Sequence, residues 1–164
     1  MTKTITFVRH GQSLANAGGV TMAHDAIPLT ELGHRQAAAL ADVLDLRPAR
    51  IWVSAYGRTA ETAAPFCAKV GLRAEIHPAL HEFSAIDPAL LEGMTGEQRR
   101  PIADAYWREG DPAQRMGPQA ETFAEFDARV GDFIDRLDEL DDGTLLFGHG
   151  QWFGLVVWKL LGFS

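Results

Sequence analysis

The chain has 164 residues, of which 46% are hydrophobic and 23% are charged, the balance of an ordinary globular protein. This length fits a single domain over residues 1–164, with a core that needs no disulfides. The net charge of -7 argues against nonspecific nucleic-acid binding, which requires a basic surface, but it still allows a local cationic pocket for a small anion.

The first strand-like run, Thr4 to Val8, leads directly into Arg9, His10 and Gly11. Its β-branched and aromatic residues predict a buried strand, and the glycine predicts a sharp turn. In an α/β fold, ligands bind beyond the carboxyl ends of the strands. An imidazole beside a guanidinium at that place suits a phosphate, because histidine can attack phosphorus while arginine binds the oxygens.

A loop of small residues follows at 14–19 and contains Asn16. Asn16 could donate to a phosphate oxygen, or it could bond its own backbone in a turn, and the sequence favours neither. The next periodic segment predicts a helix that runs through about residue 46, with Thr30 as its N-cap.

The second predicted strand covers residues 50–54, and Arg58 follows it near the start of a predicted helix. Two interpretations of Arg58 are open. It could bind an anion, because the unpaired N–H groups of a helix N-terminus attract negative charge. It could instead be a surface residue paired with Glu61, which spacing alone favours slightly.

A third strand is predicted over residues 73–77, and Glu82 follows between a histidine and an aromatic residue. Partial burial there could make Glu82 a proton donor. The alternative is an exposed loop carboxylate, which is the more common state of a glutamate taken singly.

Residues 84–120 are irregular and rich in glycine and proline. One helix is predicted within about 95–108, where Thr95 and Gln98 have the spacing of a capping box. Long irregular segments in small domains often cover binding sites. We therefore expect 84–120 to be a lid that helps to select the substrate.

Apolar residues recur at spacings of three and four over 121–140, which predicts an amphipathic helix with a solvated acidic face. A fourth strand, predicted at 144–147, ends in a glycine-flanked His149 before a last helix at about 151–161. His149 is thus the third cationic or proton-carrying side chain in a strand-to-helix turn. The alternation of strands and helices predicts a largely parallel sheet with helices on both faces.

Cys67 is the only cysteine, so neither an intramolecular disulfide nor a cysteine-based zinc site can form. Its apolar neighbours indicate a buried structural thiol. The longest apolar run, 152–161, is too short to span a bilayer. Because strand-like sequence starts almost at once, we expect no signal peptide, no membrane partner and a cytoplasmic location.

Together these motifs resemble the histidine phosphatase superfamily, which includes the cofactor-dependent phosphoglycerate mutases and many small phosphatases. The resemblance covers nearly the whole chain and implies a three-layer α/β/α sandwich around a mostly parallel sheet. It rests on these segments in this order: Arg9 to Ser13 with Asn16, 28–33, Ser54 with 58–63, Glu82, 121–123 and 148–150.

The resemblance also implies a role for each matched residue. His10 would be the nucleophile that takes the phosphoryl group, attacking as a neutral imidazole. Arg9 and Arg58 would bind the phosphoryl oxygens, with Asn16 as a further donor, and His149 would stabilise charge on the transferring group. This chemistry requires no metal and no other cofactor, because arginines and histidines supply the charge.

By the same resemblance, Glu82 would protonate the leaving alcohol and then accept a proton from the water that hydrolyses the phosphohistidine. Residues 83–87 differ from the Gly- and Trp-containing segment common in small phosphatases of this family. Glu92 and Asp87 are therefore the alternative acids.

The chain ends at Ser164, whereas many members of the family continue into further strand sequence. We expect either a reduced sheet or a truncated chain. An uncovered strand edge could then recruit a second copy and form a homodimer.

Three functions remain. The favoured one is a metal-independent phosphatase for a small phosphomonoester. A phosphomutase would use the same chemistry, but it must keep water from the phosphohistidine, and family members that do so usually carry longer insertions. A member without turnover that binds phosphorylated ligands or proteins is the third, against which the intact histidines and arginines argue. The sequence does not identify the substrate.

Overall fold

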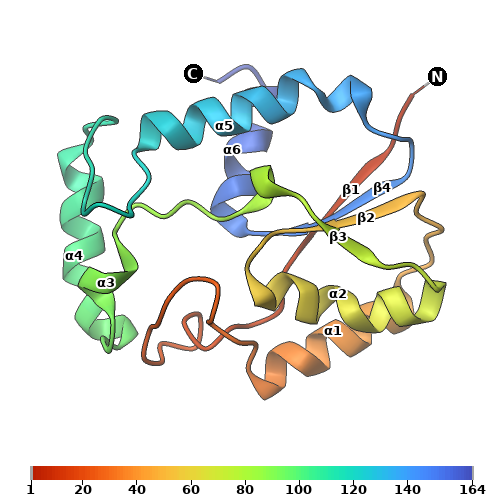
Figure 1. The fold of residues 1–164 in the computed structure, drawn as a ribbon, viewed down its shortest axis with the longest axis horizontal. Coiled ribbons are helices and arrows are strands. Elements are labelled where there is room, and N and C mark those ends of the chain that lie inside the picture. The colour runs from red at the N-terminus through yellow and green to blue at the C-terminus, as the bar shows by residue number, and fades with distance from the viewer. Residues whose placement is uncertain (1, 164) are drawn as a thin grey trace.

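A four-stranded parallel sheet forms the middle layer of the protein in a computed structural model, which describes residues 2–163 (Figure 1). The central strand β4 pairs with both β1 and β2, and β3 pairs with β2. The spatial order is β1-β4-β2-β3. The strands cover β1 (Ile5–Arg9), β2 (Arg50–Val53), β3 (Ala74–Ile76) and β4 (Thr144–Gly148).

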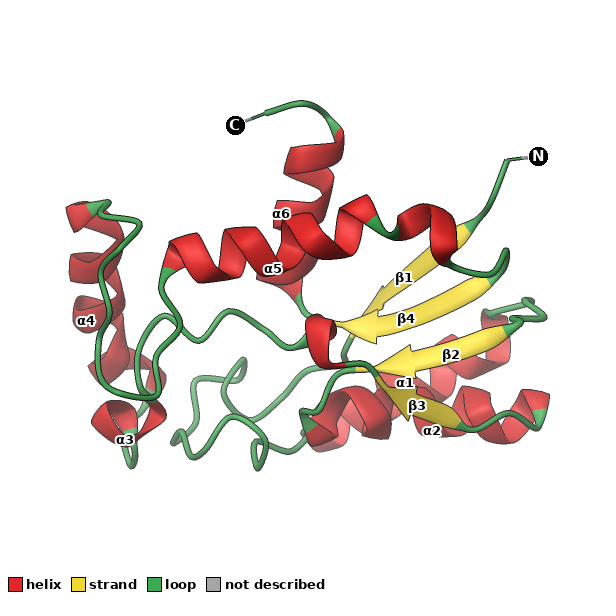
Figure 2. Cartoon of the chain, turned by 45° about the horizontal axis from the view of Figure 1, so that its top comes forward, coloured by secondary structure: helices red, strands yellow, loops and turns green. Residues whose placement is uncertain are grey.

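Helices cover both faces of this sheet, so the predicted three-layer α/β/α fold is confirmed. One face is covered by α1 (Glu31–Val43) and α2 (Gly57–Val70), and the other by α5 (Phe123–Asp135) and α6 (Gly150–Leu160). The shorter α3 (Pro88–Leu91) and the helix α4 (Gly96–Glu109) lie beyond the arrowheads of the strands (Figure 2).

Alternation along the strands divides the core into two layers. On β4, Leu146 packs in the cluster that includes α5 and α6, whereas Leu145 and Phe147 pack in the cluster that includes α1 and α2. On β2, Trp52 joins the first cluster in the same way. Successive side chains of a strand point to opposite faces, and each fully buried one stabilises the fold by roughly 1.5–3 kcal/mol. The carboxyl ends of β2 and β4 are therefore held from both sides.

Strand boundaries differ from the prediction by one or two residues. The first strand extends to Arg9, because Arg9 is in register with Gly148 of β4. The third strand is shorter than the predicted 73–77, because its pairing with β2 covers only Ala74–Ile76.

Side-chain caps define the helix starts, as expected. The hydroxyl of Thr30 accepts from the backbone N–H of Gly33 at 3.1 Å, which begins α1. The capping box of Thr95 and Gln98 is present at the start of α4. The predicted length of the helix at 121–140 is wrong, because the backbone of Arg136 leaves the helical region and α5 ends one residue earlier.

The irregular segment 84–120 contains α3, which the sequence did not predict, in addition to α4. Backbone bonds join it to the loop that follows β1. The N–H of Thr21 donates to the carbonyl of Met94 at 2.9 Å, and the N–H of Gly96 donates to the carbonyl of Gly18 at 3.0 Å. The segment is therefore attached to the same loop that carries the Arg-His-Gly turn.

Two smaller expectations concern Cys67 and the membrane. Cys67 lies partly buried on α2, and burial raises the pKa of its thiol, which fits a structural residue. Within residues 2–163, none of the helices combines the length and the apolar character that a bilayer crossing requires.

Candidate active site

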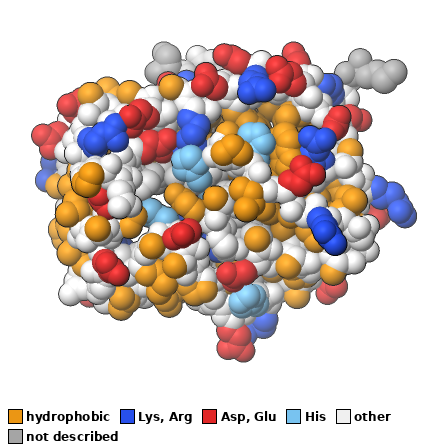
Figure 3. All heavy atoms as spheres, in the orientation of Figure 1, with side chains coloured by type: hydrophobic (Ala, Val, Ile, Leu, Met, Phe, Trp, Pro, Cys, Tyr) orange, Lys and Arg blue, Asp and Glu red, His pale blue; other side chains and the backbone are white. Residues whose placement is uncertain are grey.

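Three strands end at the same place and bring the predicted site together. Arg9 is in register with Gly148, and Val53 with Phe147. His10 and His149, each the next residue of its strand, therefore lie side by side, and their ring centroids are 5.1 Å apart. Figure 3 shows histidine side chains near a hollow on this face of the molecule.

The turn after β1 is held by close backbone contacts. The N–H of His10 donates to the carbonyl of Gly148 at 3.0 Å. The N–H of Gly11 donates to the hydroxyl of Thr62 on α2 at 3.0 Å. A Cβ at Gly11 would lie 2.7 Å from the carbonyl oxygen of Gly33 on α1. Glycine is required here because two backbones approach too closely for a side chain.

Arg58 lies between the two histidines and is only 5% exposed. Its Nε donates to Nε2 of His10 at 3.2 Å, and Nη2 contacts Nδ1 of His149 at 3.3 Å. Nη1 donates to the carbonyl of His24 at 2.8 Å. The interpretation of Arg58 as a surface residue paired with Glu61 is therefore wrong.

The Glu61 carboxylate instead accepts from the N–H of Leu29 at 3.1 Å and lies 3.6 Å from His34. Spacing could not reveal this, because helix geometry places Glu61 one turn after Arg58 whether or not the two side chains meet.

Arg58 also determines which ring nitrogens carry protons. A guanidinium can only donate, so Nε2 of His10 and Nδ1 of His149 are the bare nitrogens. Nδ1 of His10 then donates to the carbonyl of Gly11 at 2.6 Å, and Nε2 of His149 donates to the hydroxyl of Ser54 at 2.7 Å. The lone pair of His10 Nε2 therefore points toward Arg58, the arginine that would bind a phosphate.

Burial and positive charge keep both imidazoles neutral. Burial lowers the pKa of His10 to about 4, Arg58 and Arg9 add to this effect, and the carbonyl of Gly11 opposes it. Burial lowers the pKa of His149 to about 2, with Arg58 as the next cause. A neutral His10 is the form that can attack phosphorus.

Arg9 and Asn16 lie at the exposed side of this site. The side chain of Arg9 lies beside Gly150, at the start of α6. Asn16 accepts from the N–H and the hydroxyl of Ser13 through Oδ1, at 3.2 and 2.9 Å. Its oxygen thus makes the local turn bonds of one interpretation, while its amide nitrogen is the group that could donate to a phosphate.

Glu82 is attached to the N-terminus of α6, which begins directly after His149. Its carboxylate accepts from the N–H of Gln151 at 3.1 Å and from the N–H of Trp152 at 2.9 Å. The alternative acids lie in other surroundings. Asp87 is buried and caps α3 through the N–H of Ala89 at 3.0 Å, and Glu92 is exposed. Glu82 is therefore the one of the three that is bound next to the histidine pair.

Several residues of this site were not assigned a role from the sequence. The ring of Tyr56 lies 4.9 Å from the guanidinium of Arg58 and contacts His149 edge-on. His24 supplies the carbonyl that binds Arg58. The only sequence signal for Tyr56 is its position two residues before Arg58, and His24 has none, because its contact depends on how the loop after β1 folds back.

Two cavities flank this constellation. One, of about 610 Å³, is lined by polar groups that include His24, Tyr56, His81 and Glu121. The other, of about 870 Å³, is lined mostly by aromatic and aliphatic side chains. Among residues 2–163, no group of three or more His, Cys, Asp or Glu side chains has the arrangement of a metal site.

Comparison with known proteins identifies the family. Residues 5–164 match the model of the histidine phosphatase superfamily (branch 1). A protein of Yersinia enterocolitica named "Probable phosphoglycerate mutase GpmB" is 30% identical over 167 residues, which cover 96% of this chain and 74% of that protein.

Two solved structures share the fold. The alpha-ribazole phosphatase from Shigella flexneri has a TM-score of 0.78 and 27% identity, over 98% of this chain and 80% of that one. A mycobacterial glucosyl-3-phosphoglycerate phosphatase in complex with VO3 has a TM-score of 0.78 and 26% identity, over 99% and 84%. The predicted enzyme class, phosphoric monoester hydrolase, is confirmed by this kinship. The chain belongs to branch 1 of the histidine phosphatase superfamily, as its motifs predicted.

Proposed function

We propose that the chain is a metal-independent phosphatase that hydrolyses a small phosphomonoester through a phosphohistidine on His10. One observation carries the proposal: a neutral His10, bonded at Nδ1 by the carbonyl of Gly11, presents Nε2 to the buried Arg58. Nucleophile and phosphate-binding group are thus already in contact.

The first step transfers the phosphoryl group to His10. The phosphoryl oxygens take the donors of Arg58 that otherwise bond the two imidazoles, and Arg9 adds a second cation at the exposed side. Nε2 of His10 forms the new bond to phosphorus as the P–O bond to the leaving group breaks. Glu82 gives its proton to the leaving oxygen, so the alcohol departs neutral.

The second step hydrolyses the phosphohistidine. Glu82, now a carboxylate, accepts a proton from water as the water oxygen attacks phosphorus. The P–N bond breaks, phosphate leaves, and the neutral imidazole of His10 is restored.

Before the substrate binds, the neutral ring of His149 accepts from the guanidinium of Arg58 and holds it in place. The negative charge of a bound phosphoryl group then favours protonation of His149, which would let this ring donate to the transferring group and stabilise its charge.

A phosphomutase is the second candidate, because a matched relative carries that name. The two functions differ in the acceptor of the phosphoryl group, which is water in one case and an alcohol in the other. A binding protein without turnover is the third candidate.

Several finer expectations join this proposal. We retain 84–120 as a lid that selects the substrate, which its bonds to the loop after β1 support. A small phosphorylated substrate follows from the family. The cytoplasmic location and the homodimer stay predictions.

The test is hydrolysis of p-nitrophenyl phosphate in the presence of EDTA, for the parent chain, His10→Ala and Glu82→Gln. Activity that survives EDTA and is lost in His10→Ala supports the proposal, and a slow Glu82→Gln variant supports the acid. Near-normal turnover by His10→Ala refutes it. If the parent chain is inactive, the same protein is saturated with a ³²P-labelled phosphomonoester, and the absence of acid-labile, base-stable label favours the binding protein.

A further inference from the structure

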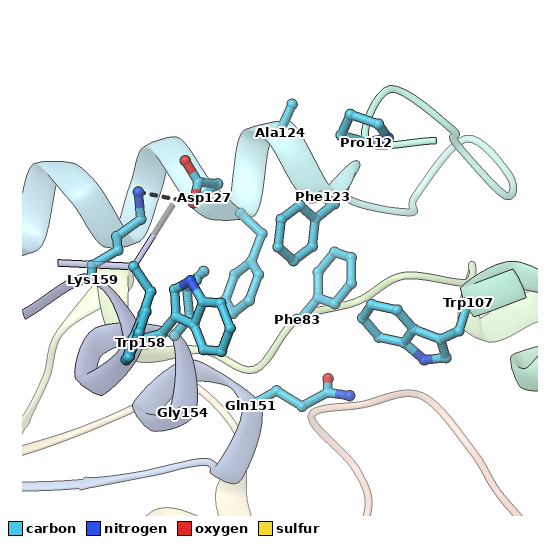
Figure 4. Close-up of a pocket in the computed structure, with 13 residues that line it drawn as sticks. Phe83, Trp107, Pro112, Phe123, Ala124, Asp127, Gln151, Gly154, Trp158 and Lys159 are labelled. Atoms are coloured by element: carbon cyan, nitrogen blue, oxygen red, sulfur yellow. Dashed lines mark ion pairs between the residues drawn. The ribbon is translucent and has the colours of Figure 1, made fainter. Parts of the chain in front are cut away.

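We propose that the apolar cavity beside Glu82 receives the leaving group of the substrate, and that this group is an uncharged aromatic or bulky apolar alcohol. The inference rests on the proposed phosphatase function and names the class of its substrate. The cavity measures about 870 Å³, which is within the range of small-molecule sites (Figure 4).

Two of the residues that line the cavity adjoin Glu82, the proposed acid. Gln151 lines the cavity, and the backbone N–H of the same residue donates to the carboxylate of Glu82. Phe83, the next residue after Glu82, forms another part of its wall. Figure 4 shows the side chains of Phe83 and Gln151 on either side of the cavity. An alcohol protonated by Glu82 would therefore lie close to an apolar space.

Aromatic side chains from three helices form a large part of the remaining wall. Trp107 comes from α4, Phe123 from α5 and Trp158 from α6. Trp107 and Trp158 are each 51% exposed, which is unusual for the largest apolar side chain. Flat apolar faces that are open to solvent favour contact with a planar or bulky apolar group.

The charges at this cavity leave no partner for a charged ligand. Lys159 and Asp127, the two charged residues that line it, pair with each other at 2.8 Å. Gln151 is the remaining polar side chain and is neutral. The polar cavity of about 610 Å³ differs in charge, because the carboxylates of Asp25 and Glu121 line it. An uncharged apolar leaving group therefore fits the first cavity and a polyhydroxy group the second.

The first experiment compares kcat/KM for ethyl phosphate, 2-(2-naphthyl)ethyl phosphate and glycerol 3-phosphate. All three release a primary alcohol, so their intrinsic reactivity is similar. Burial of the naphthyl ring should raise kcat/KM by about 30-fold or more over ethyl phosphate. If all three esters are hydrolysed with equal kcat/KM, the inference is overturned and the proposed function stands. A clear preference for glycerol 3-phosphate also overturns the inference, because the leaving group then occupies the polar cavity. No turnover of any ester refutes the proposed function and the inference with it.

The second experiment fills the cavity from within. Gly154 lines it, and an added Cβ there meets nothing within 4 Å, so Gly154→Leu should fold normally. It should lower the naphthyl-to-ethyl ratio of kcat/KM about 10-fold, because the leucine occupies the ring's space. Trp158→Ala should lower the same ratio by removing a wall. The control, Val43→Ala on the exposed side of α1, should keep it. A ratio that neither cavity variant changes overturns the inference.

Discussion

Arg129 joins α5 to the segment that carries Glu82, and its replacement by methionine should weaken both the fold and the catalysis. Its Nε and Nη2 each donate to the carboxylate of Glu121 at 2.8 Å. Its Nη1 donates to the carbonyls of Ala79 at 2.8 Å and His81 at 3.0 Å. The side chains of Arg129 and Glu121 are 16% and 15% exposed. One guanidinium therefore connects α5, the residue that follows the 84–120 segment and the backbone just before Glu82.

The expected loss is about 3 kcal/mol in the free energy of unfolding. Removing one partner of a buried ion pair costs about 3–5 kcal/mol, because the other charge is left without compensation. The lower end of this energy range applies here, because about a sixth of each of the two side chains still contacts water. The guanidinium carbon of Arg129 also lies 5.1 Å from the centroid of the Phe126 ring, a contact that methionine loses. Methionine keeps much of the apolar stem of arginine, so the loss comes from hydrogen bonds and charge, with little contribution from a cavity.

Urea unfolding of Arg129→Met, Glu121→Gln and the double variant measures this interaction as a double-mutant cycle. The loss of unfolding free energy in the double variant should be smaller than the sum of the two single losses, because each single variant already removes the same ion pair. Arg129→Lys should show an intermediate loss, since an ammonium lacks the fork that reaches the carboxylate and the two carbonyls together. The kcat of Arg129→Met for p-nitrophenyl phosphate should also fall. A loss below about 1 kcal/mol in Arg129→Met, or fully additive losses, would contradict this reasoning.

Three further predictions concern the histidine pair and the turn after β1. Because the folded pKa values of His10 and His149 are about 4 and about 2, the unfolded chain binds more protons below pH 6.5. The free energy of unfolding should therefore fall as pH decreases from 6.5 to 4, by about 1.4 kcal/mol per pH unit for each ring, as urea unfolding at several pH values can measure. Gly33→Ala should destabilise the protein by about 1–3 kcal/mol, because its Cβ would lie 2.2 Å from the carbonyl oxygen of Gln12, in the turn after β1. Gly154→Ala, in open space, is the control and should be neutral or stabilising in thermal unfolding. Ser54→Ala should cost about 1–3 kcal/mol and lower kcat, because it leaves Nε2–H of His149 without its acceptor; unchanged kcat would show that this bond does not position the ring.

The sheet and the histidine pair could be predicted because both depend on local sequence and on one general rule. Apolar runs before His10 and His149 predict strands. Parallel strands that end at the same edge bring the residues after them together. The register of Arg9 with Gly148 realises this expectation. The resemblance in motifs then predicts the chemistry of the site, because strand patterns alone predict only where its residues lie.

Residues whose role depends on how loops fold back could not be predicted in the same way. Arg129 pairs with Glu121 and with carbonyls about fifty residues earlier, a contact that no helical spacing encodes. Tyr106 and Trp107 are neighbours on α4, yet Tyr106 is buried in the core and Trp107 is half exposed at the apolar cavity. Which of two adjacent aromatic residues faces a cavity depends on the angle at which α4 packs, and this angle follows from tertiary contacts.

Arg58 shows why the chemistry of this site requires the structure as well as the motif. The motif identifies two histidines and an arginine, but the protonation of the histidines depends on where the guanidinium lies. Because Arg58 donates to one nitrogen of each ring, it selects both tautomers, and its charge and the surrounding burial keep both rings neutral. The same donors are those that a phosphoryl group would take over. Binding of the substrate would therefore release the lone pair of His10 and position the phosphorus for attack in a single rearrangement of hydrogen bonds.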